Sequence, residues 1–235
     1  MARFLLVHPP LLGPSVWQNC AAVLRDRGHS VTAPDLRGEV EPAAEWWSRW
    51  ADVCADAITG VDLVAAHSGA GVVLPLVAEA TDPRSVAFVD AVVPSDGSIT
   101  APNENLVAFV RALPSDDHLP PWTAWWSEDD VAELLPDPEL RAQIAAEQPR
   151  LPADFYDHAV PVPPRWTEGR AITYVRFSEA YEHDAAEASR RHWTVRRMPG
   201  SHLHLIDHAE EVAEALLSAV APVKPDSQCP PPPRA

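Results

Sequence analysis

The sequence predicts an α/β protein with a mostly parallel, doubly wound sheet and a helical insertion. Over the first hundred residues, short apolar runs alternate with longer segments of helical apolar spacing. Such alternation is typical of parallel sheets, in which a helix connects one strand to the next. The alternation stops near residue 95 and resumes near residue 170. With 235 residues, 46% of them hydrophobic, the chain can bury a substantial core.

The expected elements follow in chain order. Before the insertion we expect strands over 3–8, 29–38 (running into a loop), 61–66 and 85–93, and helices over 15–28, 43–58 and 71–80. Gly28 closes the first of these helices, as glycine commonly does. After the insertion we expect strands over 171–178 and 193–200 and helices over 182–192 and 208–221.

The insertion is rich in Pro, Asp and Trp and shows no strand alternation. Helices are plausible over 128–135 and 137–148, so we predict a helical cap over 96–168. The core then comprises 1–95 and 169–222. The tail, 223–235, is rich in proline without apolar periodicity, and we expect it to be disordered.

Composition excludes several classes of function. The net charge of −16 argues against nucleic acids and anionic membranes as partners. No apolar run approaches the roughly 18 residues of a membrane span, and the start lacks the features of a signal peptide. We therefore expect a cytoplasmic protein. A single lysine with abundant Ala and Pro favours a GC-rich bacterial source.

Cofactors and metals are not expected either. The three cysteines are odd in number and widely spaced, which argues against a disulfide framework and a zinc motif. The sequence "HSGAG" is too short for a dinucleotide-binding fingerprint, and no phosphate-cradling glycine loop is present.

A candidate nucleophile stands at the centre of "VDLVAAHSGAGVVLPLVAEA", residues 61–80. A strand, a sharp turn and a helix, with small residues two before and two after a serine, are typical of a nucleophile elbow. Ser68 has Ala66 and Ala70 at those positions, where glycine is usual. On its own, the pattern fits a structural serine in a tight turn equally well.

Four ordered motifs favour a catalytic role for Ser68: "LLVHPPLLG", "GHSVTAPDLRG", "AHSGAG" and "GSHLHLIDHAEEV". With them the chain resembles the α/β-hydrolase superfamily, over roughly residues 1–95 and 170–222. The resemblance implies that Ser68 is the nucleophile and His202 the general base. His204 and His208 are alternative bases, and a surface histidine is the alternative interpretation of His202.

The acid of the triad is harder to assign. The position that many family members use, after the strand 171–178, falls here at Ala180 or Tyr181, and neither can hold an imidazolium electrostatically. The resemblance offers a second location at the end of the preceding strand, where "FVDAVVP" places Asp90. We favour Asp90, with Glu179 as the alternative acid on a shifted loop.

The same resemblance implies an oxyanion hole made of two backbone amides. One follows the nucleophile, at Gly69. The other falls at Pro10, which has no N–H, so Leu11 is the expected substitute donor. Loss of one such donor costs on the order of 10²–10³ in rate.

Further residues are candidates for substrate contact: His8, Pro10, His67, Trp122, Trp126 and Tyr181. Aromatic side chains of a cap commonly line an apolar pocket. The alternative is that the histidines only bond to backbone and that the tryptophans bury the cap against the core.

We therefore expect a serine hydrolase that cleaves an ester, thioester or lactone of a small apolar or aromatic molecule. The alternative is a lyase, cyclase or isomerase of specialised metabolism in which Ser68 and His202 perform acid–base chemistry. A non-catalytic binding protein is a third hypothesis. The expected partner is a small-molecule substrate, and a homodimer stays open.

Overall fold

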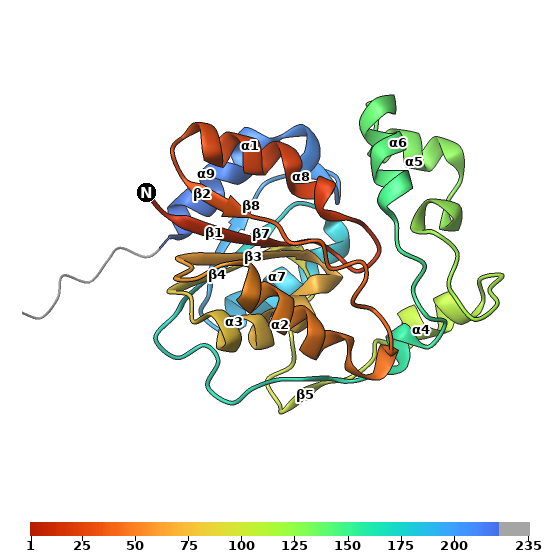
Figure 1. Cartoon of the computed structure of the whole chain (residues 1–235), viewed down its shortest axis with the longest axis horizontal. Coiled ribbons are helices and arrows are strands. Elements are labelled where there is room, and N and C mark those ends of the chain that lie inside the picture. Colours follow the sequence, from red (N-terminus) through yellow and green to blue (C-terminus); the bar gives the residue numbers. More distant parts are fainter. Residues whose placement is uncertain (221–235) are drawn as a thin grey trace, which may run out of the picture.

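The computed structural model describes residues 1–220, and at their centre lies a six-stranded sheet (Figure 1). The strand order is β2-β1-β3-β4-β7-β8, and every neighbouring pair is parallel. The strands are β1 (Arg3–Val7), β2 (Ser30–Thr32), β3 (Leu63–Ser68), β4 (Ser85–Ala91), β7 (Ala171–Arg176) and β8 (Thr194–Arg197). The predicted doubly wound α/β fold is confirmed.

Helices cover both faces of this sheet (Figure 1). One face carries α1 (Gln18–Asp26), α8 (His204–Asp207) and α9 (Ala209–Ala219). The other carries α2 (Trp46–Ala57), α3 (Leu74–Thr81) and α7 (Glu182–Arg190).

The inner strands β1, β3, β4 and β7 are largely apolar and buried because successive side chains enter opposite layers, each covered by helices. In β1, Phe4 and Leu6 pack on the α1 and α9 side, whereas Leu5 and Val7 pack on the α2 and α3 side. All residues of β4 are buried. This two-sided core fixes the ends of β3 and β4, at which Ser68 and Asp90 lie.

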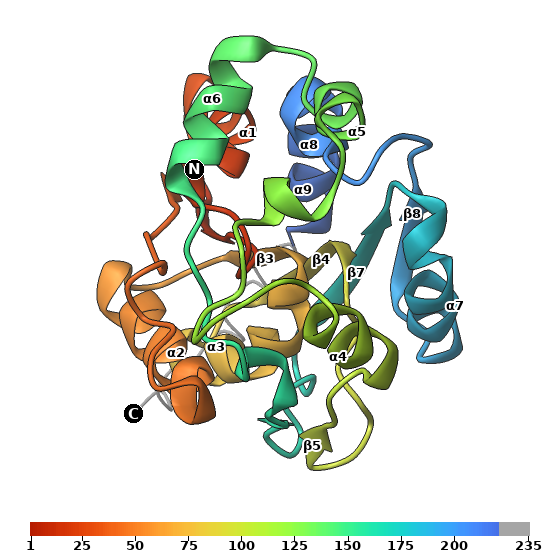
Figure 2. The same cartoon turned by 90° about the vertical axis from the view of Figure 1, so that its right-hand side faces the viewer.

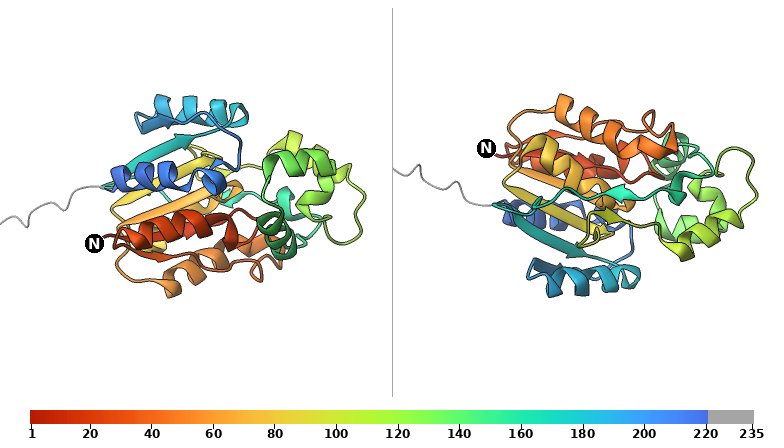
Figure 3. Two further views of the ribbon diagram at one scale, coloured as in Figure 1. Left: turned by 90° about the horizontal axis from the view of Figure 1, so that it is seen from above. Right: turned by 90° about the horizontal axis from the view of Figure 1, so that it is seen from below.

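The chain between β4 and β7 leaves the sheet at the carboxyl ends of its strands (Figures 1 and 3). It contains α4 (Glu104–Arg111), α5 (Glu128–Leu134) and α6 (Pro138–Glu147), which spread across the front of the view in Figure 2. Asn103, Ser127 and Asp137 cap these helices with side-chain hydrogen bonds to backbone N–H groups. This is the segment predicted as a cap, and α5 and α6 match the two helices expected there.

The segment also holds elements that the sequence does not indicate. A short antiparallel ladder joins β5 (Ile99–Thr100) to β6 (Val160–Pro161). Two-residue strands are too short to show alternation, which explains why the pattern fails to predict them. The segment contains two short 3₁₀ turns, Trp122–Trp125 and Phe155–Asp157. Further 3₁₀ turns lie in the rest of the chain: Pro14–Trp17, Ala43–Glu45, Gly69–Val73 and Glu179–Tyr181.

Two expectations lie outside the described residues, namely the end of the core at 222 and the disordered tail 223–235. Within residues 1–220, no helix is long and apolar enough to cross a membrane.

Candidate active site

Ser68 lies at the end of β3 in a strained backbone conformation, with φ 58° and ψ −131°. Such a conformation is sparsely populated and persists only where the surroundings enforce it. The flanking Ala66 and Ala70 are fully buried, and a methyl group on Gly71 would collide with the carbonyl of Val92. Small residues are therefore required around the turn, which has the geometry of a nucleophile elbow.

The structure brings Ser68, His202 and Asp90 into one hydrogen-bonded line. His202 Nε2 is 2.9 Å from Ser68 Oγ, and His202 Nδ1 is 2.7 Å from Asp90 Oδ2. An ionised carboxylate only accepts hydrogen bonds, so Nδ1 carries the proton and Nε2 accepts from the Ser68 hydroxyl. In this arrangement the neutral imidazole is oriented to take the serine proton.

Asp90 is held as an ionised group at the end of β4. Its fully buried side chain accepts hydrogen bonds from the backbone N–H groups of Phe177 and Ser178 and from the Ser178 hydroxyl. Burial raises the pKa of Asp90, but the hydrogen bonds from His202 and Ser178 outweigh it and bring the pKa below its usual value. Ser178 is a site residue that motif reasoning missed, although it lies two residues after β7, the strand paired with β4.

The alternative acid and bases lie elsewhere. The carboxylate of Glu179 is 2.7 Å from Arg176, and its side chain is 90% exposed. His204 and His208 stack on each other with ring centroids 4.0 Å apart, and His204 faces Glu211 at 3.7 Å. The geometry therefore favours Asp90 and His202 over these alternatives.

Two histidines expected to face the pocket are fully buried instead. His8 donates from Nδ1 to the carbonyl of Pro9 and accepts at Nε2 from the N–H of Leu36. Burial lowers the pKa of His8 to about 4, so this ring is neutral and joins two loops. His67 bonds through Nε2 to the carbonyl of His202, at 3.0 Å, and its ring stacks on the His202 ring. Both side chains thus bond to backbone, the alternative considered for them, and neither lines the cavity beside Gly69.

Tyr181 reaches the nucleophile itself. Its hydroxyl is 3.2 Å from Ser68 Oγ, and its ring lies parallel to the His202 ring, with an interplanar angle of 9°. Burial raises the pKa of Tyr181 to about 12, so the phenol keeps its proton at neutral pH. The sequence places Tyr181 among the substrate-contacting residues but does not indicate the contact with Ser68.

The two segments expected to form the oxyanion hole, at Gly69 and at Pro10, lie against each other. Gly69 starts a 3₁₀ turn, and N–H groups in the first turn of a helix have no partner within that helix. A methyl group on Gly69 would come within 3.3 Å of Pro10 Cδ, so the proline ring packs directly against this residue. Leu12 N–H bonds to the carbonyl of Pro9 and closes a turn that contains Leu11.

An apolar cavity of about 130 Å³ opens beside Gly69 and Pro10. Trp46 and Phe155 stack on each other at its wall, with ring centroids 4.8 Å apart. The other lining residues come mainly from the chain between β4 and β7: Val92, Thr100, Ala101, Pro102, Asn103, Leu106, Tyr156, His158 and Val160, with Val72 after the elbow. No Asp, Glu, Lys or Arg lines this cavity among the described residues, so it suits a neutral apolar group.

Trp122 and Trp126 do not line this cavity in the described part of the chain. Trp126 is 46% exposed and stacks on Phe109, and Trp122 packs against the core on the α1 and α9 side. The aromatic wall comes from Trp46 and Phe155 instead. Periodicity assigns Trp46 to a helix face without showing that this face reaches the pocket.

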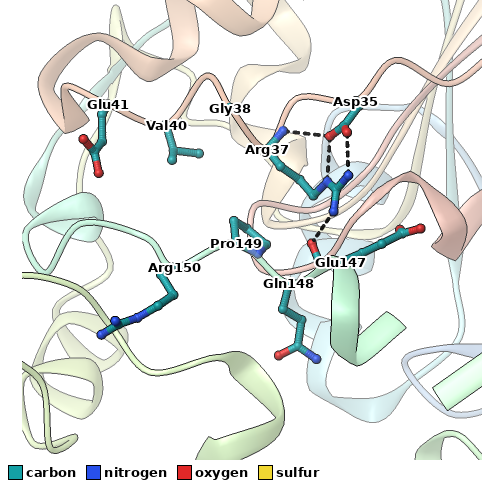
Figure 4. Close-up of a pocket in the computed structure, with 9 residues that line it drawn as sticks. All are labelled: Asp35, Arg37, Gly38, Val40, Glu41, Glu147, Gln148, Pro149 and Arg150. Carbon is teal, nitrogen blue, oxygen red and sulfur yellow. Dashed lines mark hydrogen bonds and ion pairs between the residues drawn. The ribbon is translucent and has the colours of Figure 1, made fainter. Parts of the chain in front are cut away.

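A second hollow, of about 440 Å³, lies between the loop after β2 and the chain after α6 (Figure 4). Arg37 donates three hydrogen bonds to the Asp35 carboxylate, one from its backbone N–H and two from its guanidinium, and a fourth to the carbonyl of Glu147 (Figure 4). Arg150 pairs with Asp116 and Glu41 with His118, both outside the lining, and none of the lining residues belongs to the Ser68 line.

Within residues 1–220, no group of three or more His, Cys, Asp or Glu side chains is arranged to hold a metal ion.

Comparison with known proteins identifies the family. A model of the alpha/beta hydrolase family matches residues 4–215, and the chain belongs to this family. No curated protein matches the chain.

Solved structures with the same fold share little sequence with this chain. An extracellular α/β-hydrolase from a Paenibacillus species has 16% identity and a TM-score of 0.73, over 94% of this chain and 100% of that one. Tomato methylketone synthase I has 17% identity and a TM-score of 0.70, over 92% and 96%. Polyneuridine aldehyde esterase has 19% identity and a TM-score of 0.66, over 93% and 98%. At such low identity these likenesses establish the fold and leave the reaction to be argued from the site.

Proposed function

We propose that this protein is a serine hydrolase that cleaves an ester, thioester or lactone of a small apolar molecule. The observation that carries the proposal is the Ser68–His202–Asp90 line at a strained turn, with distances of 2.9 Å and 2.7 Å. Ser68 attacks the acyl carbon while His202 takes its proton, and Asp90 stabilises the imidazolium that forms. Gly69 and Leu11 are the proposed oxyanion donors.

The size of the apolar cavity supports the proposal that the substrate carries a small acyl group. A dry apolar cavity of about 150 Å³ is known to hold benzene, and the cavity beside Gly69 measures about 130 Å³. A phenyl ring or a chain of roughly four to six carbons therefore fits. Longer chains would have to displace the Trp46 and Phe155 wall, and overpacking of this kind is unfavourable.

This proposal is tested with p-nitrophenyl esters of graded acyl length. We expect hydrolysis that Ser68→Ala abolishes, with kcat/KM at least about tenfold higher for butanoate or hexanoate than for dodecanoate. Leu106→Trp fills the cavity and should move the preference toward acetate. Ala108 lies on the same helix as Leu106, α4, but is exposed, so Ala108→Trp is the matched control and should leave the acyl-length preference unchanged. Ester turnover equal in wild type and Ser68→Ala would refute the proposal.

A second candidate function rests on Pro10. Because Pro10 packs on Gly69 and lacks an N–H, one oxyanion donor of a typical hydrolase is missing at that position. An enzyme without an acyl intermediate, such as a lyase, cyclase or isomerase, needs this donor less. Failure of every acyl ester, with a substrate converted in a Ser68- and His202-dependent way, would favour this alternative.

A further inference from the structure

The Ser68 oxygen has two polar neighbours, of which the triad explains only one. His202 Nε2 lies 2.9 Å from Ser68 Oγ, and the hydroxyl of Tyr181 lies 3.2 Å from the same atom. The Ser68 hydroxyl has one hydrogen to donate, and it donates this hydrogen bond to His202 Nε2. Nε2 must accept because the Nδ1–H of His202 already donates to Asp90. The bond with Tyr181 therefore runs from the phenol O–H to the serine oxygen.

The segment after β7 fixes this phenol. Phe177 and Ser178 hold Asp90 through their N–H groups, and the N–H of Tyr181 bonds back to the carbonyl of Ser178. The Tyr181 ring packs on the His202 ring with centroids 4.9 Å apart, and the His67 ring also stacks on His202, with centroids 4.6 Å apart. The same short stretch of chain thus positions the acid and the phenol.

We propose that Tyr181 is a catalytic residue that stabilises Ser68 Oγ as a leaving group when the acyl-enzyme is hydrolysed. This inference rests on the proposed serine hydrolase function. Water attacks the acyl carbon and gives a proton to His202. The bond between that carbon and Ser68 Oγ then breaks, its electron pair passes to Oγ, and His202 returns the proton to Oγ. Tyr181 keeps its own proton and donates a hydrogen bond to the oxygen as negative charge develops there.

The two half-reactions respond differently to this hydrogen bond. During acylation the serine oxygen loses electron density to the substrate, so a donor on that oxygen gives no advantage. During deacylation the oxygen gains electron density, and a hydrogen bond to a charged group is worth more than one to a neutral group. Tyr181 should therefore accelerate deacylation selectively.

Tyr181→Phe tests the proposal because it keeps the ring on His202 and removes only the hydroxyl. Stopped-flow measurements with p-nitrophenyl butanoate should show acylation within about threefold of wild type and deacylation slower by about 10- to 100-fold. A burst of p-nitrophenol followed by a slow steady state is the expected signature. Labelling of Ser68 by a fluorophosphonate, which requires only the attack step, should keep its wild-type rate.

Two further variants separate this role from a structural one. Tyr181→Leu also removes the stacked ring and should slow both steps. Tyr174→Phe removes a buried phenol that bonds the backbone of Ala91; it should lower the unfolding temperature and leave the ratio of the two rates unchanged. Equal slowing of both steps in Tyr181→Phe, or no slowing, overturns the role of Tyr181 while the triad stands. Absence of Ser68-dependent turnover and labelling in wild type overturns both proposals.

Discussion

Replacing His202 with alanine should lower kcat for ester hydrolysis by about 10⁴- to 10⁶-fold, because no other base lies on Ser68 Oγ. The only other polar side chain within hydrogen-bond distance of that oxygen, among residues 1–220, is Tyr181, whose pKa is raised to about 12. A phenol in this state cannot take the serine proton at neutral pH. Steady-state kinetics with p-nitrophenyl butanoate measure the effect.

His208→Ala is the matched control for this prediction. Its ring is exposed and stacks on His204, away from the Ser68 line. We expect kcat within a few-fold of wild type. A loss in His208→Ala as large as in His202→Ala would show that the base has been assigned to the wrong histidine.

Asp90→Asn should lower kcat by about 10⁴-fold, the size of effect known for the equivalent change in serine proteases. The carboxylate holds the proton on His202 Nδ1, whereas an amide can turn its NH₂ toward this nitrogen and stabilise the wrong tautomer. The substitution also places a donor where Phe177, Ser178 and His202 all donate. Urea unfolding should accordingly show a lower free energy of unfolding.

The acid assignment has its own discriminating variant. Glu179 is exposed and paired with Arg176, so Glu179→Gln should keep kcat within a few-fold of wild type. If Glu179→Gln were inactive and Asp90→Asn active, the acid would be Glu179 on a rearranged loop.

Acid pH should weaken the folded state through Asp90. The pKa of Asp90 is lowered in the folded protein, so its contribution to stability is present above the ordinary carboxyl pKa, about 4, and is lost as the pH falls through the folded value.

The triad candidates were within reach of sequence reasoning for a topological reason. Parallel strands bring their carboxyl ends to one edge of the sheet, so residues that follow different strands meet there. Ser68 ends β3 and Asp90 lies near the end of β4, its direct neighbour, and His202 follows β8 on the loop before α8. The resemblance to the α/β-hydrolase superfamily implied their roles, and the observed strand order explains why they meet.

The walls of the pocket were beyond such reasoning because they depend on how loops and helices pack. Trp46 and Trp50 lie four residues apart on α2, so helical periodicity places them on the same face. Trp50 nevertheless packs beside the buried His8, whereas Trp46 lines the cavity. His8 follows a core strand, a position from which a side chain can face a pocket. The sequence does not show that its ring instead accepts a hydrogen bond from the N–H of Leu36. The resemblance puts the usual acid position at Ala180 or Tyr181, and only the structure shows that the Tyr181 hydroxyl contacts Ser68 Oγ.

The most direct test of the central claim is covalent trapping of Ser68. The folded protein is treated with a fluorophosphonate probe, digested and examined by peptide mass spectrometry, with residual ester hydrolysis measured in parallel. We predict one adduct on the peptide that contains Ser68, loss of hydrolysis in step with labelling, and no adduct in His202→Ala. An unmodified Ser68 in a protein that still hydrolyses its substrate would contradict the assignment of Ser68 as the nucleophile.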